Sequence, residues 1–511
     1  MKNQAIGQII GGEFNKIIVR AKKGSNIQIG EILVSEDENY KFFFQVYNLV
    51  YGSQISQQNL ELISGLELEE ENEYSLYDAH LRKYILVICK NLLVFDKKRN
   101  TSEIAKSMPE LLAKVRRINN NDLNILTKPE NALFIGNLRS GSKKLDINVF
   151  IDGKKMFQHH VLVAATTGRG KSNLTSVIIW NALYSDYASF LILDAHDEYF
   201  GRNKIGLKDH KNKDKVVYYT SNSFPGCISL YVNINDLSPY DLYSIADWSS
   251  PQKEAMTWFY NKSKNWIKEL LTYNVTNNSV IRPETLSVIK RRFFSLLDIE
   301  EKDDKLNFKG IFKDDDNINT IDDICNDLER GKTVIIDTSN LSSEQEIIIG
   351  SAIANKMFCK YKKYKKDGEL NSKPNIIFVI EEAPRVLGKE VLKSGNNIFS
   401  TIAREGRKFK IGLYAITQTP SEIPRQILTN INTKIILGLE TKPERQAIIE
   451  SSSNDLSNDE KMIASLGVGE AIITSNFLGF AIPIKIPKFE EFAKKQENNA
   501  NIIDKSIIDL V

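Results

Sequence analysis

The residues best suited to chemistry lie in one short stretch, Thr167-Gly-Arg-Gly-Lys-Ser-Asn173. Its glycines allow successive backbone N–H groups to turn inward around phosphate oxygens, Lys171 can reach the β- and γ-phosphates, and the Ser172 hydroxyl can bind Mg²⁺. The usual spacing, G-x-x-x-x-G-K-[ST], has a glycine where this chain has Ala165, a mild departure. We therefore predict a phosphate-binding loop for ATP, formed by Thr167, Gly168, Arg169, Gly170, Lys171, Ser172 and Asn173.

A phosphate loop also needs an acidic residue at the end of a neighbouring strand, and three apolar runs end in one. They end at Asp194, at Asp337 and at the doublet Glu381-Glu382. Hydrolysis requires one carboxylate to support Mg²⁺ through its water shell and another to polarise the attacking water. Only the doublet supplies two carboxylates, so we assign Glu381 to the metal and Glu382 to catalysis. Ser172 and Asp194 are the further candidates for the metal shell.

Polar and basic residues around one further strand candidate complete the predicted catalytic set. The strand at 411–416 is followed by Gln418, which can contact both the γ-phosphate and the attacking water and so sense the nucleotide state. Just before this strand, Arg404 and Arg407 lie in a helix-to-strand turn. Either arginine could reach the γ-phosphate of a neighbouring subunit, an effect of about 10³ to 10⁵ in rate. We favour Arg407, with Arg404 as the alternative.

The pattern around the loop predicts the elements that position these residues. Residues 161–164 are apolar and indicate a buried strand, and an amphipathic helix follows from about Lys171 to Leu183. Strand candidates then alternate with helices, which predicts a mostly parallel, doubly wound α/β sheet. These candidates are residues 189–193, 216–219, 333–336, 376–380, 411–416 and 434–439.

Residues 1–94 have a different pattern, with short apolar or alternating runs separated by Gly-, Asn- and Glu-rich turns. This pattern favours a small N-terminal β-barrel, with a helix possible in the acidic stretch 54–77. Residues 95–130 have mixed charge and are interpreted as a connector with one helix. Strands at 132–138 and 145–151 begin the predicted ATPase core, which runs over 131–488.

Two segments stand apart from the alternating pattern of the core. Residues 235–330 have helical periodicity around 240–247, 252–271 and 284–297, which predicts a helical insertion with Trp248, Trp258 and Trp266 available for its core. The C-terminal tail, 489–511, is amphipathic and charged, and we interpret it as a segment that packs on a neighbouring subunit.

Composition limits the class of protein. With 511 residues, 42% of them hydrophobic, the chain is expected to form two or three globular domains. It has no apolar run of the ~18 residues that span a bilayer and no signal peptide, so we expect a soluble, cytoplasmic protein without a membrane partner. The four cysteines lack metal-site spacing and are interpreted as buried thiols. A net charge of +3 is too small to indicate nucleic acid by itself, so any basic surface must be local.

Taken together, these motifs resemble the HerA-type hexameric DNA translocases, relatives of FtsK among the RecA-like P-loop ATPases. Besides the phosphate loop, the resemblance rests on residues 193–199, similar to the family's Asp-x-His-Gly-Glu-Tyr, and on residues 379–383, 402–409 and 417–418. The start, 6–11, resembles the small barrel that precedes the family's ATPase core. The resemblance implies a RecA-like core, a homo-hexamer with ATP between subunits, double-stranded DNA in its channel, and a NurA-type nuclease partner in DNA end resection.

Three positions depart from the family's pattern. Asp197 replaces a glycine, Glu381 replaces the commoner Asp, and His159 stands before His160 where the family often has Arg. The last departure puts an arginine contact to the nucleotide in doubt.

Contacts to DNA phosphates need Lys or Arg but no base-reading pattern. The candidates are residues 385–397, with Lys389 and Lys393, and the turn 421–425. The basic run 360–366 is interpreted as a solvated helix face.

Two other functions compete with an ATP-driven DNA translocase. A nucleotide-gated scaffold that recruits a nuclease or an antiviral defence complex, with little ATP turnover, would fit Ala165 and the altered acidic motifs. A conjugation-type ATPase at a membrane is disfavoured, because no transmembrane segment is found. Duplex-dependent ATP hydrolysis that is lost in Lys171→Ala would separate the translocase from the scaffold.

Overall fold

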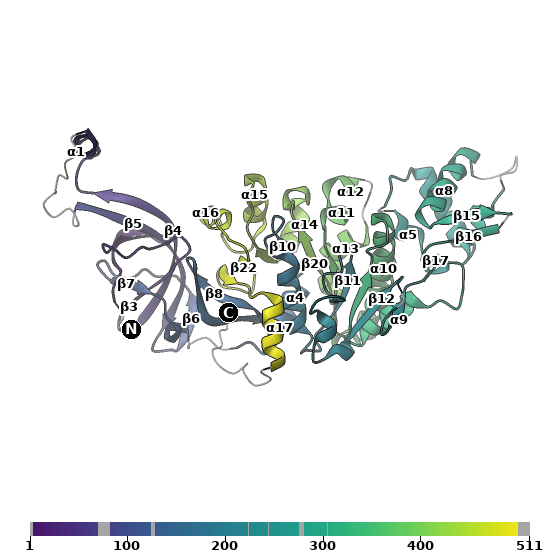
Figure 1. Cartoon of the computed structure of the whole chain (residues 1–511), viewed down its shortest axis with the longest axis horizontal. Coiled ribbons are helices and arrows are strands. Elements are labelled where there is room, and N and C mark those ends of the chain that lie inside the picture. Colours follow the sequence, from purple (N-terminus) through teal and green to yellow (C-terminus); the bar gives the residue numbers. More distant parts are fainter. Residues whose placement is uncertain are drawn as a thin grey trace. The chain divides into compact units, whose positions relative to one another are not determined.

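The computed structural model describes residues 4–69, 82–123, 128–222, 224–243, 245–274, 281–303, 305–393, 395 and 397–498. The chain forms two compact units (Figure 1). Unit 1 combines Met1–Ile151 with Asn454–Ile486, and unit 2 combines Asp152–Ser453 with Pro487–Ile503. Over the described ranges, no helix has both the length and the apolar character of a membrane span.

Unit 1 contains the predicted N-terminal barrel. Its seven-stranded sheet has the order β2-β1-β7-β3-β4-β5-β6, and an additional pairing of β2 with β5 closes the barrel. Apolar side chains such as Phe42, Phe44, Val87 and Val115 fill its interior and are almost fully buried. The strands are β1 (Gly7–Glu13), β2 (Lys16–Ala21), β3 (Ile32–Glu36), β4 (Tyr40–Ser53), β5 (Lys83–Asp96), β6 (Thr101–Ile104) and β7 (Lys114–Arg117).

Helix α1 (Gln57–Glu69) lies between β4 and β5, within the acidic stretch where a helix was expected; residues 70–77 of that stretch lie outside the described residues. Among the described residues of the connector 95–130, the one expected α-helix is not found, and the segment has only the short 3-10 helix Asn120–Leu123. This segment contributes β7 to the barrel, with Val115 buried in the core, and β6, which pairs with β5 at the edge of the sheet. The other elements of unit 1 are β8 (Ala132–Ser140), β9 (Lys143–Asp152), α16 (Glu460–Ala464), β22 (Glu470–Thr474) and β23 (Ile482–Lys485).

Unit 2 is built on the predicted parallel sheet, with strand order β13-β12-β18-β11-β19-β20-β10-β21. All neighbouring strands in this order pair in parallel, so their carboxyl ends meet at one edge, here called the carboxyl edge. The strands are β10 (Val161–Ala164), β11 (Ala188–Asp194), β12 (Val216–Thr220), β13 (Ile228–Ser229), β18 (Thr333–Asp337), β19 (Asn375–Ile380), β20 (Ile411–Thr417) and β21 (Thr433–Ile436).

The strands of this sheet are nearly continuous apolar runs because helices cover them, as is usual in parallel sheets. Helix α10 packs on both α9 and α13, and α9 and α13 contact the strands. The helices are α3 (Gly153–Gln158), α4 (Lys171–Ala182), α9 (Thr320–Glu329), α10 (Ser343–Asp367), α11 (Pro384–Leu387), α12 (Lys389–Lys393), α13 (Ile398–Glu405), α14 (Arg425–Asn430), α15 (Lys442–Ser451) and α17 (Phe489–Asn498).

The insertion is helical as predicted, but it also contains a β-hairpin formed by β15 and β16. Trp248 and Trp266 are buried in its core, whereas Trp258 is 38% exposed, so the core role expected of Trp258 is wrong. The elements are β14 (Val232–Asn233), α5 (Pro239–Leu242), α6 (Ser250–Lys262), α7 (Trp266–Thr272), α8 (Pro283–Leu296), β15 (Ile299–Lys302), β16 (Lys305–Phe308) and β17 (Phe312–Lys313).

Two expectations about single segments need correction. Helix α17 packs on α4 of its own chain, where Trp180 Nε1 donates a hydrogen bond to Gln496 at 3.1 Å; residues 499–511 of the tail lie outside the described residues. Of the four cysteines, all free, Cys89 and Cys325 are buried as expected, whereas Cys227 is half-buried and Cys359, in α10, is exposed.

The buried amine of Lys434, in β21, makes folding stability pH-dependent. Its ammonium group donates to the carbonyls of Ile431 and Ser451, and burial lowers the pKa of Lys434 from 10.5 to about 7. Between these values the unfolded chain binds more protons than the folded chain, so stability rises with pH. We expect the wild type to gain on the order of 1 kcal/mol per pH unit relative to Lys434→Met between about pH 7.5 and 9.5. Denaturant titrations at each pH measure this, and a pH-independent difference would contradict it.

Candidate active site

The predicted phosphate loop connects β10 to α4 at the carboxyl edge. Gly168 and Gly170 have φ angles of +76° and +97°, in the left-handed region that favours glycine, so the loop turns as the pattern requires. Ala165 is buried, is absent from the positive-φ residues, and donates its N–H to the Thr417 carbonyl at 3.1 Å. A glycine is therefore unnecessary at position 165, and the departure from the usual spacing is local.

Lys171 is held inside the loop and faces carboxylates. Its ammonium group donates to the carbonyls of Ala165 and Thr166, both at 3.3 Å, and is half-buried. Burial lowers the pKa of Lys171, whereas the negative charge of Glu382, then of Glu381, raises it. A desolvated cation that bonds only to carbonyls attracts an anion strongly, as phosphate binding requires.

Gln418 touches the phosphate loop directly. It follows β20, which lies between β10 and β19, and in the parallel register Ala164 is paired with Thr417. The Thr167 hydroxyl donates a hydrogen bond to Gln418 Oε1 at 2.6 Å. The predicted sensor and the loop therefore form one hydrogen-bonded unit.

The carboxylate doublet follows β19 at the same edge, and its two members have different environments. Burial raises the pKa of Glu381 to about 7, even though the Tyr199 hydroxyl donates a hydrogen bond to Glu381 Oε1 and opposes this. Burial also raises the pKa of Glu382, which the Lys171 charge lowers. Glu381 is thus tied to the protein, whereas Glu382 faces the lysine.

The other two acidic candidates are occupied by structural contacts. Asp194 accepts hydrogen bonds from the backbone N–H groups of residues 196, 198 and 199, at 3.3, 3.0 and 3.1 Å. Asp337 accepts from Thr220 Oγ1 at 2.7 Å and pairs with Arg202. Asp194 therefore holds the loop that follows β11, and it does not enter the metal set proposed below.

That loop brings Glu198, to which the sequence analysis assigned no role, to the site. Glu198 lines a cavity with Ser172, and its charge acts on Lys171. Tyr199, the next residue, is fully buried against Glu381. The signal was present in the acidic motif 193–199, whose Glu-Tyr pair matches the family pattern.

The backbone conformation of Asp197 explains why this residue can replace the glycine of the family's acidic motif. It has φ +51°, so the position needs the left-handed conformation that the family's glycine adopts easily. Aspartate is one of the few other residues that tolerate this region. Asp197 therefore conserves the turn that presents Glu198.

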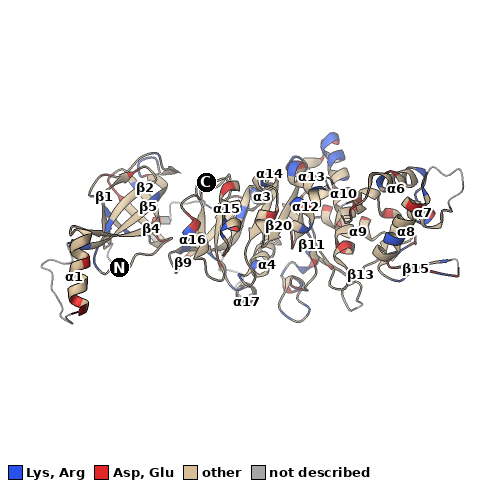
Figure 2. Ribbon diagram, turned by 90° about the horizontal axis from the view of Figure 1, so that it is seen from above, with Lys and Arg blue, Asp and Glu red and all other residues tan. Residues whose placement is uncertain are grey.

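The two arginines lie at the opposite edge of the sheet from their own phosphate loop. Arg404 lies in the last turn of α13 and Arg407 lies in the 3-10 helix Gly406–Phe409, just before β20; both are exposed. Figure 2 marks the basic residues on these elements. Because β20 has 7 residues and a strand rises ~3.3 Å per residue, about 20 Å separates Arg407 from the loop of its own chain.

His160 occupies the amino end of β10 and is structural. Its Nδ1 accepts the Leu413 N–H at 3.0 Å, and burial lowers the pKa of His160 to about 4. The preceding His159 is also buried, and its carbonyl accepts the Asn432 N–H. Both histidines lie at the amino edge, away from the phosphate loop.

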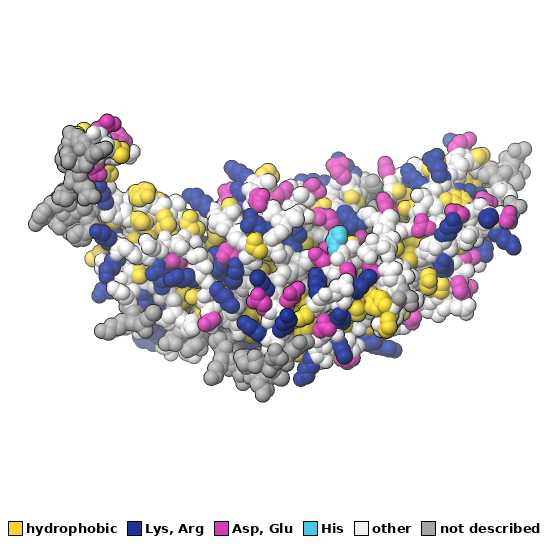
Figure 3. Space-filling model, viewed as in Figure 1, with side chains coloured by type: hydrophobic (Ala, Val, Ile, Leu, Met, Phe, Trp, Pro, Cys, Tyr) yellow, Lys and Arg dark blue, Asp and Glu magenta, His cyan; other side chains and the backbone are white. Residues whose placement is uncertain are grey.

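The candidate DNA loops are joined at the carboxyl edge. Lys389, in α12, donates to the Ser421 carbonyl at 2.7 Å, and Ser421 in turn bonds to Glu444. Lys393 is exposed and pairs with Glu390 at 2.7 Å. In the run 360–366, Tyr361 is fully buried, so it cannot stack on a base. Over the face seen in Figure 3, basic and acidic side chains are interspersed rather than segregated.

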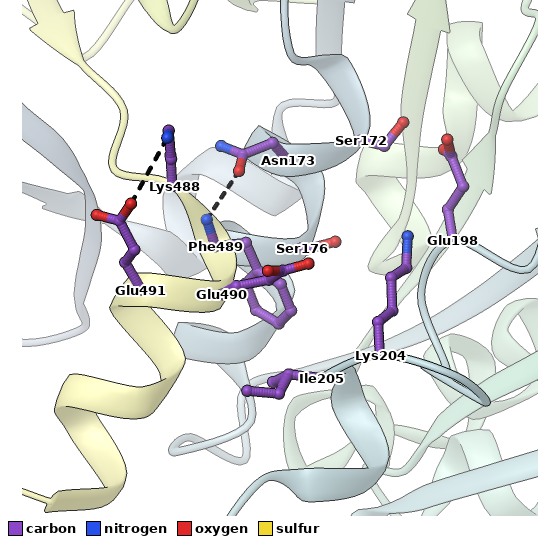
Figure 4. Close-up of a pocket in the computed structure, with 10 residues that line it drawn as sticks. All are labelled: Ser172, Asn173, Ser176, Glu198, Lys204, Ile205, Lys488, Phe489, Glu490 and Glu491. Carbon is purple, nitrogen blue, oxygen red and sulfur yellow. Dashed lines mark hydrogen bonds and ion pairs between the residues drawn. The ribbon is translucent and has the colours of Figure 1, made fainter.

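A cavity of about 370 Å³ opens beside the loop (Figure 4). Ser172, Glu198 and the Lys204 ammonium group converge on one side of it, and residues 488–491 form the other side. The side chain of Asn173 is engaged by the chain itself: its Oδ1 accepts the Phe489 N–H at 2.8 Å and its Nδ2 donates to the Pro487 carbonyl at 2.9 Å. The side chain of Asn173 is therefore engaged, and its backbone N–H is the group that can bind a phosphate.

Arg169 at the tip of the loop is half-buried and pairs with Glu440 at 3.1 Å.

The residues present fit ATP with Mg²⁺. The two left-handed glycines and the half-buried lysine suit a triphosphate, and a Cβ added at Gly168 would enter open space, where a phosphate can approach. A serine hydroxyl and carboxylates are the hard oxygen ligands that Mg²⁺ prefers.

The chain was compared with known proteins. Family models of the helicase HerA central domain and of the HerA-like helicase C-terminal domain match residues 133–357 and 329–483. The DNA double-strand break repair helicase HerA of Saccharolobus solfataricus is 25% identical over 495 residues, 95% of this chain and 92% of that protein. The probable DNA double-strand break repair helicase HerA of Methanocaldococcus jannaschii is 27% identical, over 74% of this chain and 80% of that protein. Among solved structures, VirB4 of Thermoanaerobacter pseudethanolicus is 14% identical with a TM-score of 0.46, over 71% of this chain and 97% of that chain.

The two family models overlap over residues 329–357 and together extend from residue 133 to residue 483. The similarity to curated HerA proteins continues through the barrel, since it covers 95% of the chain. The motifs of the ATPase core that suggested the family, apart from the arginine segment, meet at the carboxyl edge. The resemblance is confirmed, and the chain belongs to the HerA family of P-loop ATPases.

Proposed function

We propose that this protein is an ATP-driven translocase or helicase on double-stranded DNA that acts in the repair of double-strand breaks. The observation that carries the proposal is the convergence of Lys171, Glu382 and Gln418 at one edge of the sheet. DNA and break repair follow from the curated relatives, which are named DNA double-strand break repair helicases.

In this mechanism, Lys171 binds the β- and γ-phosphates and neutralises their charge. Glu382 polarises the attacking water and accepts its proton, a task for which a raised pKa is suited. Gln418 contacts the γ-phosphate and the water, and its hydrogen bond to Thr167 transmits the nucleotide state between β20 and the loop. Ser172, Glu381 and Glu198 would hold Mg²⁺, which when bound offsets charge on the transferring phosphoryl group.

The site is incomplete in one chain, which supports a ring. Arg404 and Arg407 face away from their own loop, so either can act only on the nucleotide of a neighbour. A head-to-tail contact of this kind closes into a ring when the rotation between neighbours is a whole fraction of a turn, and gives an open filament otherwise. We propose a homo-hexamer with ATP between subunits, duplex DNA in its channel, and a NurA-type nuclease as partner.

Contacts to DNA are proposed at the joined loops around Lys389 and Lys393. Lys393→Ala should weaken duplex binding and reduce the slope of log K against log salt by about 0.9 for each phosphate contact that the ring loses. Its basal ATPase rate without DNA should not change. The matched control, Lys363→Ala on the exposed face of α10, should leave both quantities unchanged.

Equal effects of both substitutions would contradict this placement of the DNA loops. The test of the function itself is movement along duplex DNA, measured as ATP-dependent displacement of a roadblock. No displacement, together with an ATPase rate that duplex DNA does not stimulate, would overturn the proposal.

No observation favours the scaffold hypothesis. Its motivation was Ala165 and the altered acidic motif. The backbone at Ala165 does not need a positive φ angle, and Asp197 adopts the positive φ angle that its position requires. Nuclease capture that depends on ATP binding but survives Glu382→Gln, without movement on DNA, would nevertheless support it.

A further inference from the structure

The cavity beside the phosphate loop begins at Ser172 and extends away from the loop. Lys171 faces Glu382, which fixes the γ-phosphate end of the nucleotide toward β19. From Ser172 the cavity continues along the first turn of α4, past Asn173 and Ser176. This is the direction in which the α-phosphate and the nucleoside must leave the loop.

The far part of the cavity has the mixed lining that a nucleoside needs. Ile205 supplies an apolar wall from the loop that follows β11, and Phe489 supplies another from the start of α17. The exposed Glu490 carboxylate lies beside them (Figure 4). Ribose hydroxyls and base amino groups are hydrogen-bond donors, and a carboxylate accepts from either. The other lining residues are polar or charged, and a volume near 370 Å³ lies within the range of small-ligand pockets.

We infer that the nucleoside of ATP binds in this cavity, between Ile205 and the first turn of α17, so that the C-terminal helix forms part of the nucleotide site. The inference rests on the proposed function, because it presumes that ATP phosphates occupy the loop.

The wall formed by α17 is fixed to the phosphate-loop helix itself. Asn173 makes two hydrogen bonds to the backbone of residues 487 and 489, at 2.9 and 2.8 Å. The Phe489 ring packs edge-on against Trp180 of α4, with ring centroids 5.4 Å apart. The cavity is therefore preorganised, and the helix that holds the phosphates also positions the wall that contacts the nucleoside.

The test compares Mg-ATP with Mg-tripolyphosphate, which has the phosphates but no nucleoside, by calorimetric titration of the full chain. Ile205→Ala and Glu490→Gln should each weaken ATP binding by about five- to tenfold, because apolar contact or an acceptor is lost. Neither should weaken tripolyphosphate binding. Phe489→Ala should weaken ATP binding by about tenfold as well.

Controls keep the outcomes distinct. Lys495→Gln, on the exposed side of α17, should change the affinity for neither ligand. If Phe489→Ala detaches α17 from α4, Ile205→Ala still tests the cavity, because Ile205 does not anchor this helix. Unchanged ATP affinity in both Ile205→Ala and Glu490→Gln would overturn the inference, as would an equal loss for both ligands. If instead Lys171→Ala binds both ligands like the wild type, the phosphate loop itself is unused and the proposed function fails.

Discussion

Glu382→Gln should lower kcat for ATP hydrolysis by about 10² to 10⁴-fold while ATP binding is retained, because the amide cannot accept the proton of the attacking water. Lys171→Ala should lose hydrolysis and binding together, since the cation that faces the γ-phosphate is removed. Steady-state phosphate release and titration with a non-hydrolysable ATP analogue separate the two effects. Both variants should also lose movement on duplex DNA.

The matched control for charge is Glu369→Gln, an exposed carboxylate beyond the end of α10. It should hydrolyse ATP like the wild type. Wild-type rates in Glu382→Gln, combined with a dead Glu381→Gln, would exchange the assigned roles of the doublet. Wild-type rates in both would remove the doublet from the chemistry altogether.

The local part of the site was predictable from sequence because its signals are local. A four-residue apolar strand, two glycines, a lysine and a serine specify β10, the loop and the start of α4 without reference to other segments. The convergence of Gln418 and Glu382 on that loop was also predictable, since parallel strands place their carboxyl ends at one edge. The order in which the strands lie was not, because β11, β18 and β19 are similar apolar runs.

Choosing between the acidic candidates required three-dimensional partners. Asp337 and Asp194 both end buried strands. Only the structure shows that Asp337 pairs with Arg202 and that Asp194 accepts hydrogen bonds from backbone N–H groups. Strand β7 was missed because its alternation is short and charged, with Val115 alone buried to 0% exposure. The amphipathic pattern of α17 indicated a buried face, but not that α4 of the same chain would cover it.

Arg407→Ala should lower kcat by about 10³ to 10⁵-fold, with little change in ATP affinity, if it stabilises the transition state on a neighbour's nucleotide. The geometry favours action between subunits, because β20 separates the arginine from its own loop. Arg404→Ala should then have a much smaller effect. The opposite ranking would assign the role to Arg404, and wild-type rates in both variants would remove the intersubunit contact.

Mixing two inactive variants tests the intersubunit step directly. An Arg407→Ala subunit retains Glu382, and a Glu382→Gln subunit retains Arg407. In a head-to-tail ring assembled from equal amounts of both, about a quarter of the sites should combine an intact glutamate with an intact arginine from the neighbour. ATP hydrolysis should therefore recover on mixing. An arginine that acted within its own chain would give no recovery at any ratio, because every subunit would carry one of the two defects.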